Sequence, residues 1–151
     1  MSKTLESIKT TYSTHIDGSA PASGVIFVFG SNLAGRHGAG AAKHAAQHCQ
    51  AKYGVGVGRT GQSYAIPTKG RQLEVLPLSE IYGHVKQFIA YAEQNPTEQF
   101  YLSRVGCGLA GYRDAQIAPM FMGSPKTVNL PREWVKHIDP QRKLENEGPS
   151  R

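Results

Sequence analysis

Residues 25–46 constrain the fold most, because an apolar, a glycine-rich and an alanine-rich stretch follow one another directly. The apolar stretch, 25–29, is Val-Ile-Phe-Val-Phe, which is typical of a strand covered on both faces. Ser31 and Asn32 follow, and their short side chains can bond neighbouring backbone. The glycines of this stretch are Gly30, Gly35, Gly38 and Gly40. The sequence therefore predicts a central strand, a glycine loop and a helix.

A glycine loop before a helix has a physical use. Glycines let the backbone approach a ligand without an intervening Cβ, and unpaired N–H groups at a helix start attract anions. The alternative is a tight strand-to-helix turn that needs positive φ, and one loop alone leaves the two equally open. A second stretch of small residues follows a later predicted strand and favours ligand binding. It consists of Gly106, Cys107, Gly108, Leu109, Ala110, Gly111 and Tyr112.

The other elements follow from periodicity and breaker residues. We expect helices over 39–53, 78–95 and 114–122, strands over 63–67, 100–105 and 127–130, an edge strand over 12–16 and a flexible loop over 54–61. Strands that alternate with helices predict an α/β fold with parallel pairings. In such a sheet ligands bind beyond the carboxyl ends of the strands. If the strands before the two glycine loops are neighbours, both loops face one crevice.

The chain suits one domain with a real core, at 151 residues. We expect that domain over 25–135, an N-terminal extension or edge strand over 1–24, and a polar tail over 136–151 that is loose or helical only on contact. The longest apolar run is too short for a bilayer, and the first residues lack the apolar segment of a secretory signal. We therefore expect a cytosolic protein without a membrane partner, and its oligomeric state stays open.

The net charge of +6 favours an anionic partner. Its distribution says more, because no Asp or Glu lies between Gly18 and Leu73. The cations of that segment are Arg36, Lys43, Lys52, Arg59, Lys69 and Arg71. A solvated basic face explains most of them. Still, the half of the chain that holds the first glycine loop has no carboxylate to repel a phosphate.

The two cysteines, Cys49 and Cys107, are too few for a disulfide scaffold and lack the spacing of a zinc site. We expect reduced thiols, no metal and no cofactor. A nucleophilic Cys107 is the alternative, but the sequence identifies no His or Asn partner for it.

At this point the motifs resemble macro domains. Ser31-Asn32-Leu33, followed by glycines and alanines, is similar to the first binding loop and helix of that family. The stretch 105–112 is similar to its later phosphate loop, and 62–69 stands where the family has the strand between them. The resemblance covers about residues 25–130, and is greatest to a small, uncharacterised branch from bacteria and phages.

The resemblance implies a three-layer α/β/α sandwich with a mixed, largely parallel sheet and a cleft for ADP-ribose or a related nucleotide diphosphate. Asn32 would contact the ribose distal to the adenine, and Gly38 and Gly40 would lie near the phosphates. Residues 108–112 would wrap the diphosphate. Tyr112 would pack on the distal ribose, with simple packing at the end of the loop as the alternative.

The resemblance fails at the general base. Hydrolytic macro domains of the mono-ADP-ribosyl hydrolase type commonly carry an aspartate after the glycine run, where this chain has Ala39. The candidate catalytic residues are therefore Asn32, His37 and Asp114. An imidazole suits base chemistry near neutral pH, although a lone histidine in a loop is more often a surface residue. Macro domains often use an early aspartate to bind the amino group of adenine, and only Asp17 lies near that stretch of this sequence. The identity of the nucleobase therefore stays open.

Two functions from different classes remain. The first is a binder of ADP-ribose or a similar nucleotide, with or without hydrolysis of an ADP-ribosyl or phosphoester linkage. The second is a basic accessory protein that binds nucleic acid, which the net charge and the basic tail favour. No helix-turn-helix, zinc-finger spacing or RNP-like aromatic strand is present in the sequence, so we rank the second lower.

Overall fold

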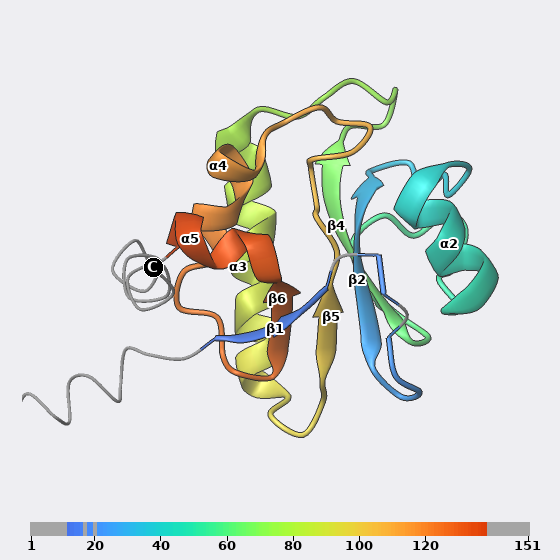
Figure 1. Cartoon of the computed structure of the whole chain (residues 1–151). Helices are drawn as coiled ribbons and strands as arrows, with labels where there is room; N and C mark the ends of the chain where they lie inside the picture. Colours follow the sequence, from blue (N-terminus) through green and yellow to red (C-terminus); the bar gives the residue numbers. More distant parts are fainter. Residues whose placement is uncertain (1–11, 17, 20, 139–151) are drawn as a thin grey trace, which may run out of the picture.

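The computed structural model describes residues 12–16, 18–19 and 21–138 (Figure 1). One sheet of six strands has the order β1-β6-β5-β2-β4-β3. The strands are β1 (Ser13–His15), β2 (Ile26–Asn32), β3 (Gly58–Thr60), β4 (Ser63–Lys69), β5 (Phe100–Leu102) and β6 (Val128–Pro131). All neighbouring strands pair in parallel except β3 and β4, which are antiparallel. The predicted mixed, largely parallel sheet is confirmed.

Helices cover both faces of the sheet (Figure 1). Helix α2 (Gly40–His48) lies on one face, and α3 (Leu78–Gln94), α4 (Asp114–Ile117) and α5 (Val135–Ile138) lie on the other. Short 3-10 helices, η1 (Ala118–Phe121) and η2 (Arg132–Trp134), join the later elements. The three layers confirm the predicted α/β/α fold class.

Strand β2 is buried on both faces, as its unbroken apolar sequence predicts. Ile26 and Val28 are fully buried in the core beneath α3, whereas Phe27 and Phe29 are buried in a second core beneath α2. Successive side chains of a strand point to opposite faces, so one strand supplies both cores. The small side chains of α2, buried at Ala42 and Ala45, let that helix approach the sheet closely.

Strand β2 is the point in the sheet from which the later strands are added on both sides. Strand β2 pairs in parallel with β4 on one side, where Phe27 lies opposite Ser63, and with β5 on the other, where Ile26 lies opposite Phe100. Loops that leave such neighbouring strands toward opposite faces of a sheet open a crevice at its carboxyl edge. The condition for a shared crevice, that the two strands before the glycine loops are neighbours, is met.

Several predicted boundaries were wrong. The helix expected over 39–53 ends at His48, because Gln50 adopts a left-handed φ of 62°. The helix expected over 114–122 is α4 followed by the 3-10 helix η1, with Pro119 near the start of η1. The strand expected over 100–105 ends at Leu102.

The ends of the chain also bear on the predictions. The edge strand expected over 12–16 is present as β1, which pairs with β6 at one edge of the sheet. At the other end the structure shows helix α5 within the first residues of the predicted tail. The rest of that tail, 139–151, lies outside the described residues, as do 1–11. Among the helices that the structure describes, none has the length and apolar character needed to cross a membrane.

The glycine-rich segment 54–61 was predicted to be a loop, but it contains β3 and supports the first glycine loop. Gly54 N–H donates to the Gly35 carbonyl at 2.8 Å, and the Ser31 hydroxyl donates to the Gly56 carbonyl at 2.5 Å. A Cβ at Gly35 would overlap the backbone of Gly54, and one at Gly56 would overlap the Asn32 carbonyl. These glycines permit two backbones to touch.

We therefore expect Gly35→Ala to lower the free energy of unfolding by more than about 2 kcal/mol, because it adds both left-handed strain at φ +72° and an overlap with backbone. Gly38→Ala is the matched control, since a Cβ at Gly38 meets nothing within 4 Å. Urea denaturation measures both variants. Equal stability of the two variants would contradict the close packing of these backbones.

Candidate functional site

A cleft of about 710 Å³ lies at the carboxyl ends of β2, β4 and β5. Both glycine loops line it: the first contributes Ser31, Asn32, Gly38 and Gly40, and the second contributes residues 106–110. These are nine of the residues that the sequence predicts for a ligand site. The volume lies within the range of small-molecule and cofactor sites.

Two close approaches bring the loops together. At the base of the cleft, a Cβ at Gly30 would lie 3.5 Å from Gly106 N, so the start of the first loop lies against the start of the second. Farther out, a Cβ at Gly40 would lie 3.6 Å from Leu109 Cδ1. The second loop is closed by the Tyr112 N–H, which donates to the Gly106 carbonyl at 2.9 Å. The two turns therefore share one pocket.

The Asn32 side chain shapes the first loop. Its Nδ2 donates to the Arg36 carbonyl at 2.8 Å, and its Oδ1 accepts the Arg36 N–H at 2.9 Å. The Asn32 carbonyl also accepts the Gly35 N–H at 2.9 Å. The amide thus closes a turn of its own chain while lining the cleft, and this holds the backbone of Arg36 in place.

Helix α2 begins at the cleft. Its N-cap, Ala39, is extended, with φ −153° and ψ 159°, and no side chain caps the helix. Residues 39–42 line the cleft. Because the first N–H groups of a helix have no partner within it, the positive end of the α2 dipole meets the cleft without a side-chain acceptor.

The charge of the cleft lining is positive. Arg36, Lys69 and Arg104 line it, and the lining residues within the described chain include no Asp, Glu or His. The first loop lies in the acid-free half of the sequence, and the second loop adds no acid to the wall. The cleft therefore favours an anionic ligand.

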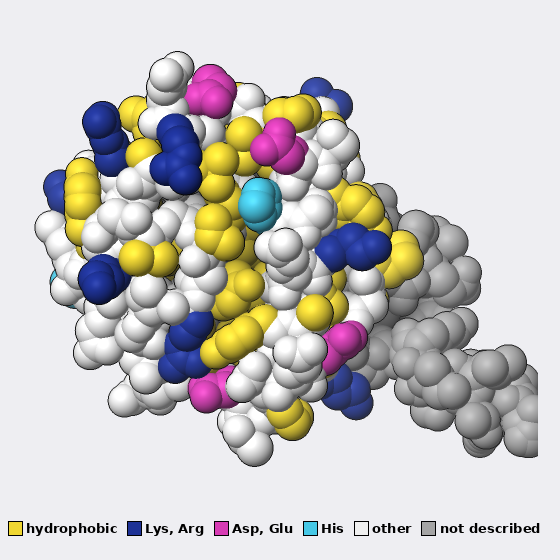
Figure 2. Space-filling view, turned by 180° about the vertical axis from the view of Figure 1, so that it is seen from behind, with side chains coloured by type: hydrophobic (Ala, Val, Ile, Leu, Met, Phe, Trp, Pro, Cys, Tyr) yellow, Lys and Arg dark blue, Asp and Glu magenta, His cyan; other side chains and the backbone are white. Residues whose placement is uncertain are grey.

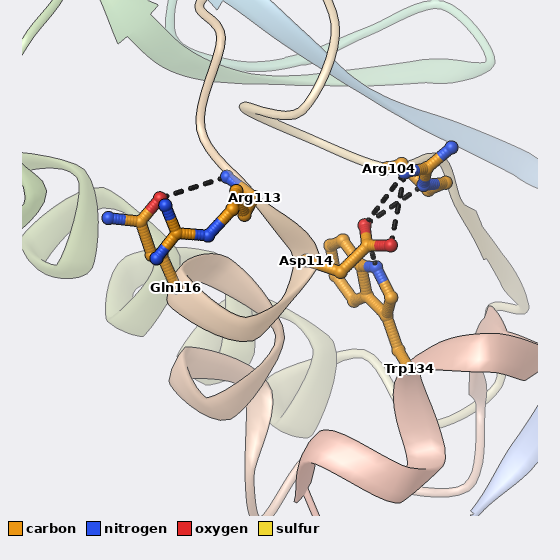
Figure 3. A network of polar contacts seen from close by, with 5 residues as sticks. All are labelled: Arg104, Arg113, Asp114, Gln116 and Trp134. Carbon is orange, nitrogen blue, oxygen red and sulfur yellow. Dashed lines mark hydrogen bonds and ion pairs between the residues drawn. The ribbon is translucent and has the colours of Figure 1, made fainter.

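A network behind the wall holds Arg104 (Figure 3). Arg104 Nε and Nη2 donate to Asp114 Oδ1 and Oδ2, each at 3.0 Å, and the indole N–H of Trp134 donates to Asp114 Oδ1 at 2.8 Å. Burial alone would raise the pKa of Asp114, but hydrogen bonds with Trp134, Arg104 and Cys107 and the charge of Arg104 hold it below the ordinary 3.8. Asp114 is therefore a weak base whose oxygens orient an arginine.

The structure does not bring Gly35, His37, Gly111, Tyr112 or Asp114 into the cleft lining. His37 is only 3% exposed, so the alternative of a plain surface histidine is wrong. Its Nε2 lies 3.0 Å from the Lys52 carbonyl, which fixes the end of the first loop. The Tyr112 hydroxyl donates to the Leu76 carbonyl at 2.8 Å, and its ring packs against the main core. These contacts match simple packing at the end of the loop.

Several lining residues were not predicted. Thr68 and Lys69 are the last residues of β4, and Ser103 and Arg104 directly follow β5. The rule that parallel strands place their carboxyl ends at one edge is the signal that could have found them. Tyr53 and Leu73 also line the cleft. No motif in the sequence marks either one, because they reach the cleft through turns whose course depends on tertiary contacts.

Comparisons of the chain with protein-family models, with curated proteins and with solved structures found no match. Within the part of the chain that the structure describes, no group of three His, Cys, Asp or Glu side chains is placed to hold a metal ion. The observations define an α/β protein with a six-stranded, mostly parallel sheet and a cationic cleft between two glycine loops.

The lowered pKa of Asp114 predicts how stability changes with pH. A carboxylate with a depressed pKa in the folded state stabilises the protein above its unfolded pKa, and this contribution is lost as the pH falls through the unfolded and then the folded value. We expect the free energy of unfolding to fall less between about pH 6 and about pH 3 in Asp114→Asn than in the wild type. Urea denaturation at both pH values measures this.

Glu93→Gln, which removes an exposed carboxylate of α3, is the control for that comparison. It should keep the pH dependence of the wild type. If Asp114→Asn showed the same pH dependence as Glu93→Gln, the network in Figure 3 would not lower the pKa of Asp114.

Proposed function

We propose that the cleft binds ADP-ribose or a related nucleotide diphosphate. One observation carries the proposal: the uncapped start of α2 and both glycine loops open into a cleft lined by Arg36, Lys69 and Arg104. Main-chain donors, a helix dipole and cations all favour a ligand with closely spaced negative charges.

The backbone at the cleft is open to such a ligand. A Cβ at Gly38 or at Gly108 would meet nothing within 4 Å, so space remains above the backbone of each loop. A diphosphate between these loops would reach backbone donors on both sides. This supports the expected roles of the glycines near the phosphates.

The arrangement also supports the macro-domain resemblance as a proposal. In macro domains a strand that ends in an asparagine leads into a glycine loop and a helix, and a later strand leads into a phosphate loop. Here Asn32 ends β2, the helix is α2, and the later strand, β5, pairs with β2. We place the distal ribose of the ligand near Asn32 on this basis.

Binding rather than turnover is the function that the side chains support. Hydrolysis requires a base within reach of the attacking water. The lining residues of the described chain include no carboxylate or imidazole, His37 is buried, and Asp114 accepts hydrogen bonds from Arg104 and Trp134. We therefore propose that the cleft holds its ligand without cleaving it.

No observation favours the nucleic-acid hypothesis over this one. On the face seen in Figure 2, Lys and Arg side chains are dispersed among neutral and apolar ones, and acidic side chains lie between them. Binding to a phosphate backbone needs cations gathered along one surface. The basic tail that suggested this function lies largely outside the described residues.

Calorimetric titration with ADP-ribose, followed by chromatography of the same mixture, tests the proposal. We expect saturable binding without products, and an affinity at least about tenfold lower in Gly108→Val, because the added side chain fills the space above the second loop. Gly83→Val is the matched control, since Gly83 lies in α3 outside the cleft and also has nothing within 4 Å of a Cβ.

Two results would contradict the proposal. Absence of heat with about millimolar ADP-ribose would reject the ligand class. Free adenosine monophosphate or ribose in the mixture would show turnover and reject binding without cleavage.

A further inference from the structure

Three large apolar side chains border the cleft yet stay in solvent: Tyr53, Leu73 and Leu109 are 65%, 41% and 69% exposed. Single exposed apolar side chains are common on protein surfaces, but three around one polar cleft form a rim. A ligand that carries an apolar planar group beside its charges would cover part of this rim. The cleft thus offers two kinds of surface, cationic and apolar.

Tyr53 is held in place by its own turn. Val55 N–H donates to the Lys52 carbonyl at 3.1 Å, and Gly54 has a φ of +96°, which is the pattern of a type II turn with Tyr53 at its second position. Gly54 N–H donates to the Gly35 carbonyl, so the turn is fastened to the first glycine loop. The tyrosine is therefore presented at the edge of that loop by rigid backbone.

Its ring has a fixed support. The Tyr53 ring packs edge to face with His37 at 5.8 Å between centroids and 71° between planes, and His37 packs in the same manner on buried Phe29 at 5.4 Å and 84°. Because His37 is also tied to the Lys52 carbonyl, the support cannot swing away without breaking that contact. An aromatic ring held this way loses little entropy when a ligand packs on it.

Leu73 adds to the apolar rim at a conformational cost. It adopts a left-handed φ of +66°, which a leucine rarely does, and its exposed side chain lines the cleft. The turn is kept by Leu73 N–H, which donates to the Gly70 carbonyl at 3.1 Å, and by Gly70 N–H, which donates to the Glu74 carbonyl at 2.8 Å. Strain of this kind is maintained by the surrounding structure and concentrates at functional sites.

We propose that Tyr53 is the stacking platform for the planar heterocyclic base of the nucleotide. This inference rests on the proposed function, because the glycine loops must hold the diphosphate for the base to reach the tyrosine. Stacking of a base on an aromatic ring tolerates any base and needs no acidic partner. That suits a cleft whose lining, among the residues that the structure describes, includes no carboxylate to read the edge of a base.

Calorimetric titration of Tyr53→Ala and Tyr53→Phe with ADP-ribose and with inorganic pyrophosphate tests this. We expect Tyr53→Ala to bind ADP-ribose at least about fivefold more weakly than Tyr53→Phe, which keeps the ring, and both to bind pyrophosphate as the wild type does. Tyr82→Ala is the control, because Tyr82 is an exposed tyrosine of α3 outside the cleft lining. Thermal unfolding of each variant checks that the fold is kept.

The outcomes separate the two proposals. If the wild type binds ADP-ribose and Tyr53→Ala binds it as Tyr53→Phe does, stacking is rejected and the proposed function stands. If Tyr53→Ala loses affinity for both ligands in parallel, Tyr53 supports the loop and stacking is again rejected. If the wild type does not bind ADP-ribose, both proposals fail.

Discussion

The parallel pairing of β2 with β5 is the constraint on which the site depends. It places the ends of two strands, separated by about half the chain, side by side, with the backbone of Gly30 directly beside that of Gly106. A Cβ at the first of these positions would lie in van der Waals contact with Gly106 N, Thr68 Oγ1 and Val105 Cγ1, each at 3.5 Å. The cleft is thus a property of the sheet, and the loops are shaped by the strands from which they emerge.

Much of this could be predicted from local sequence, because an apolar run, a glycine run and alanines at helical spacing each report their own conformation. The fold class and nine lining residues followed from these signals. The predictions that were wrong concern features that depend on contacts between distant segments of the chain. A glycine that permits two backbones to touch, such as Gly56, has the same sequence signal as one that makes a loop flexible. Nothing local marks Gln50 as a helix end or His37 as buried.

The position of Asp114 shows how a cationic side chain of the cleft wall is held in one orientation. Arg104 at the cleft needs an oriented partner, and Asp114 supplies it from α4, outside the cleft lining. The opposite charge therefore fixes the guanidinium without lining the pocket. Bidentate geometry suits this purpose, since both oxygens hold the planar group in one orientation. The same arrangement explains why a conspicuous aspartate beside a binding loop is a poor candidate for a base.

The indole behind that wall has a practical consequence. Trp134 is the one tryptophan of the chain, is fully buried, and bonds directly to the carboxylate that holds Arg104. Tryptophan fluorescence from this protein therefore originates at one known place. Asp114 connects that indole by hydrogen bonds to Arg104, which lines the pocket. The molecule carries its own optical sensor, sensitive to displacement of the arginine and requiring no attached dye.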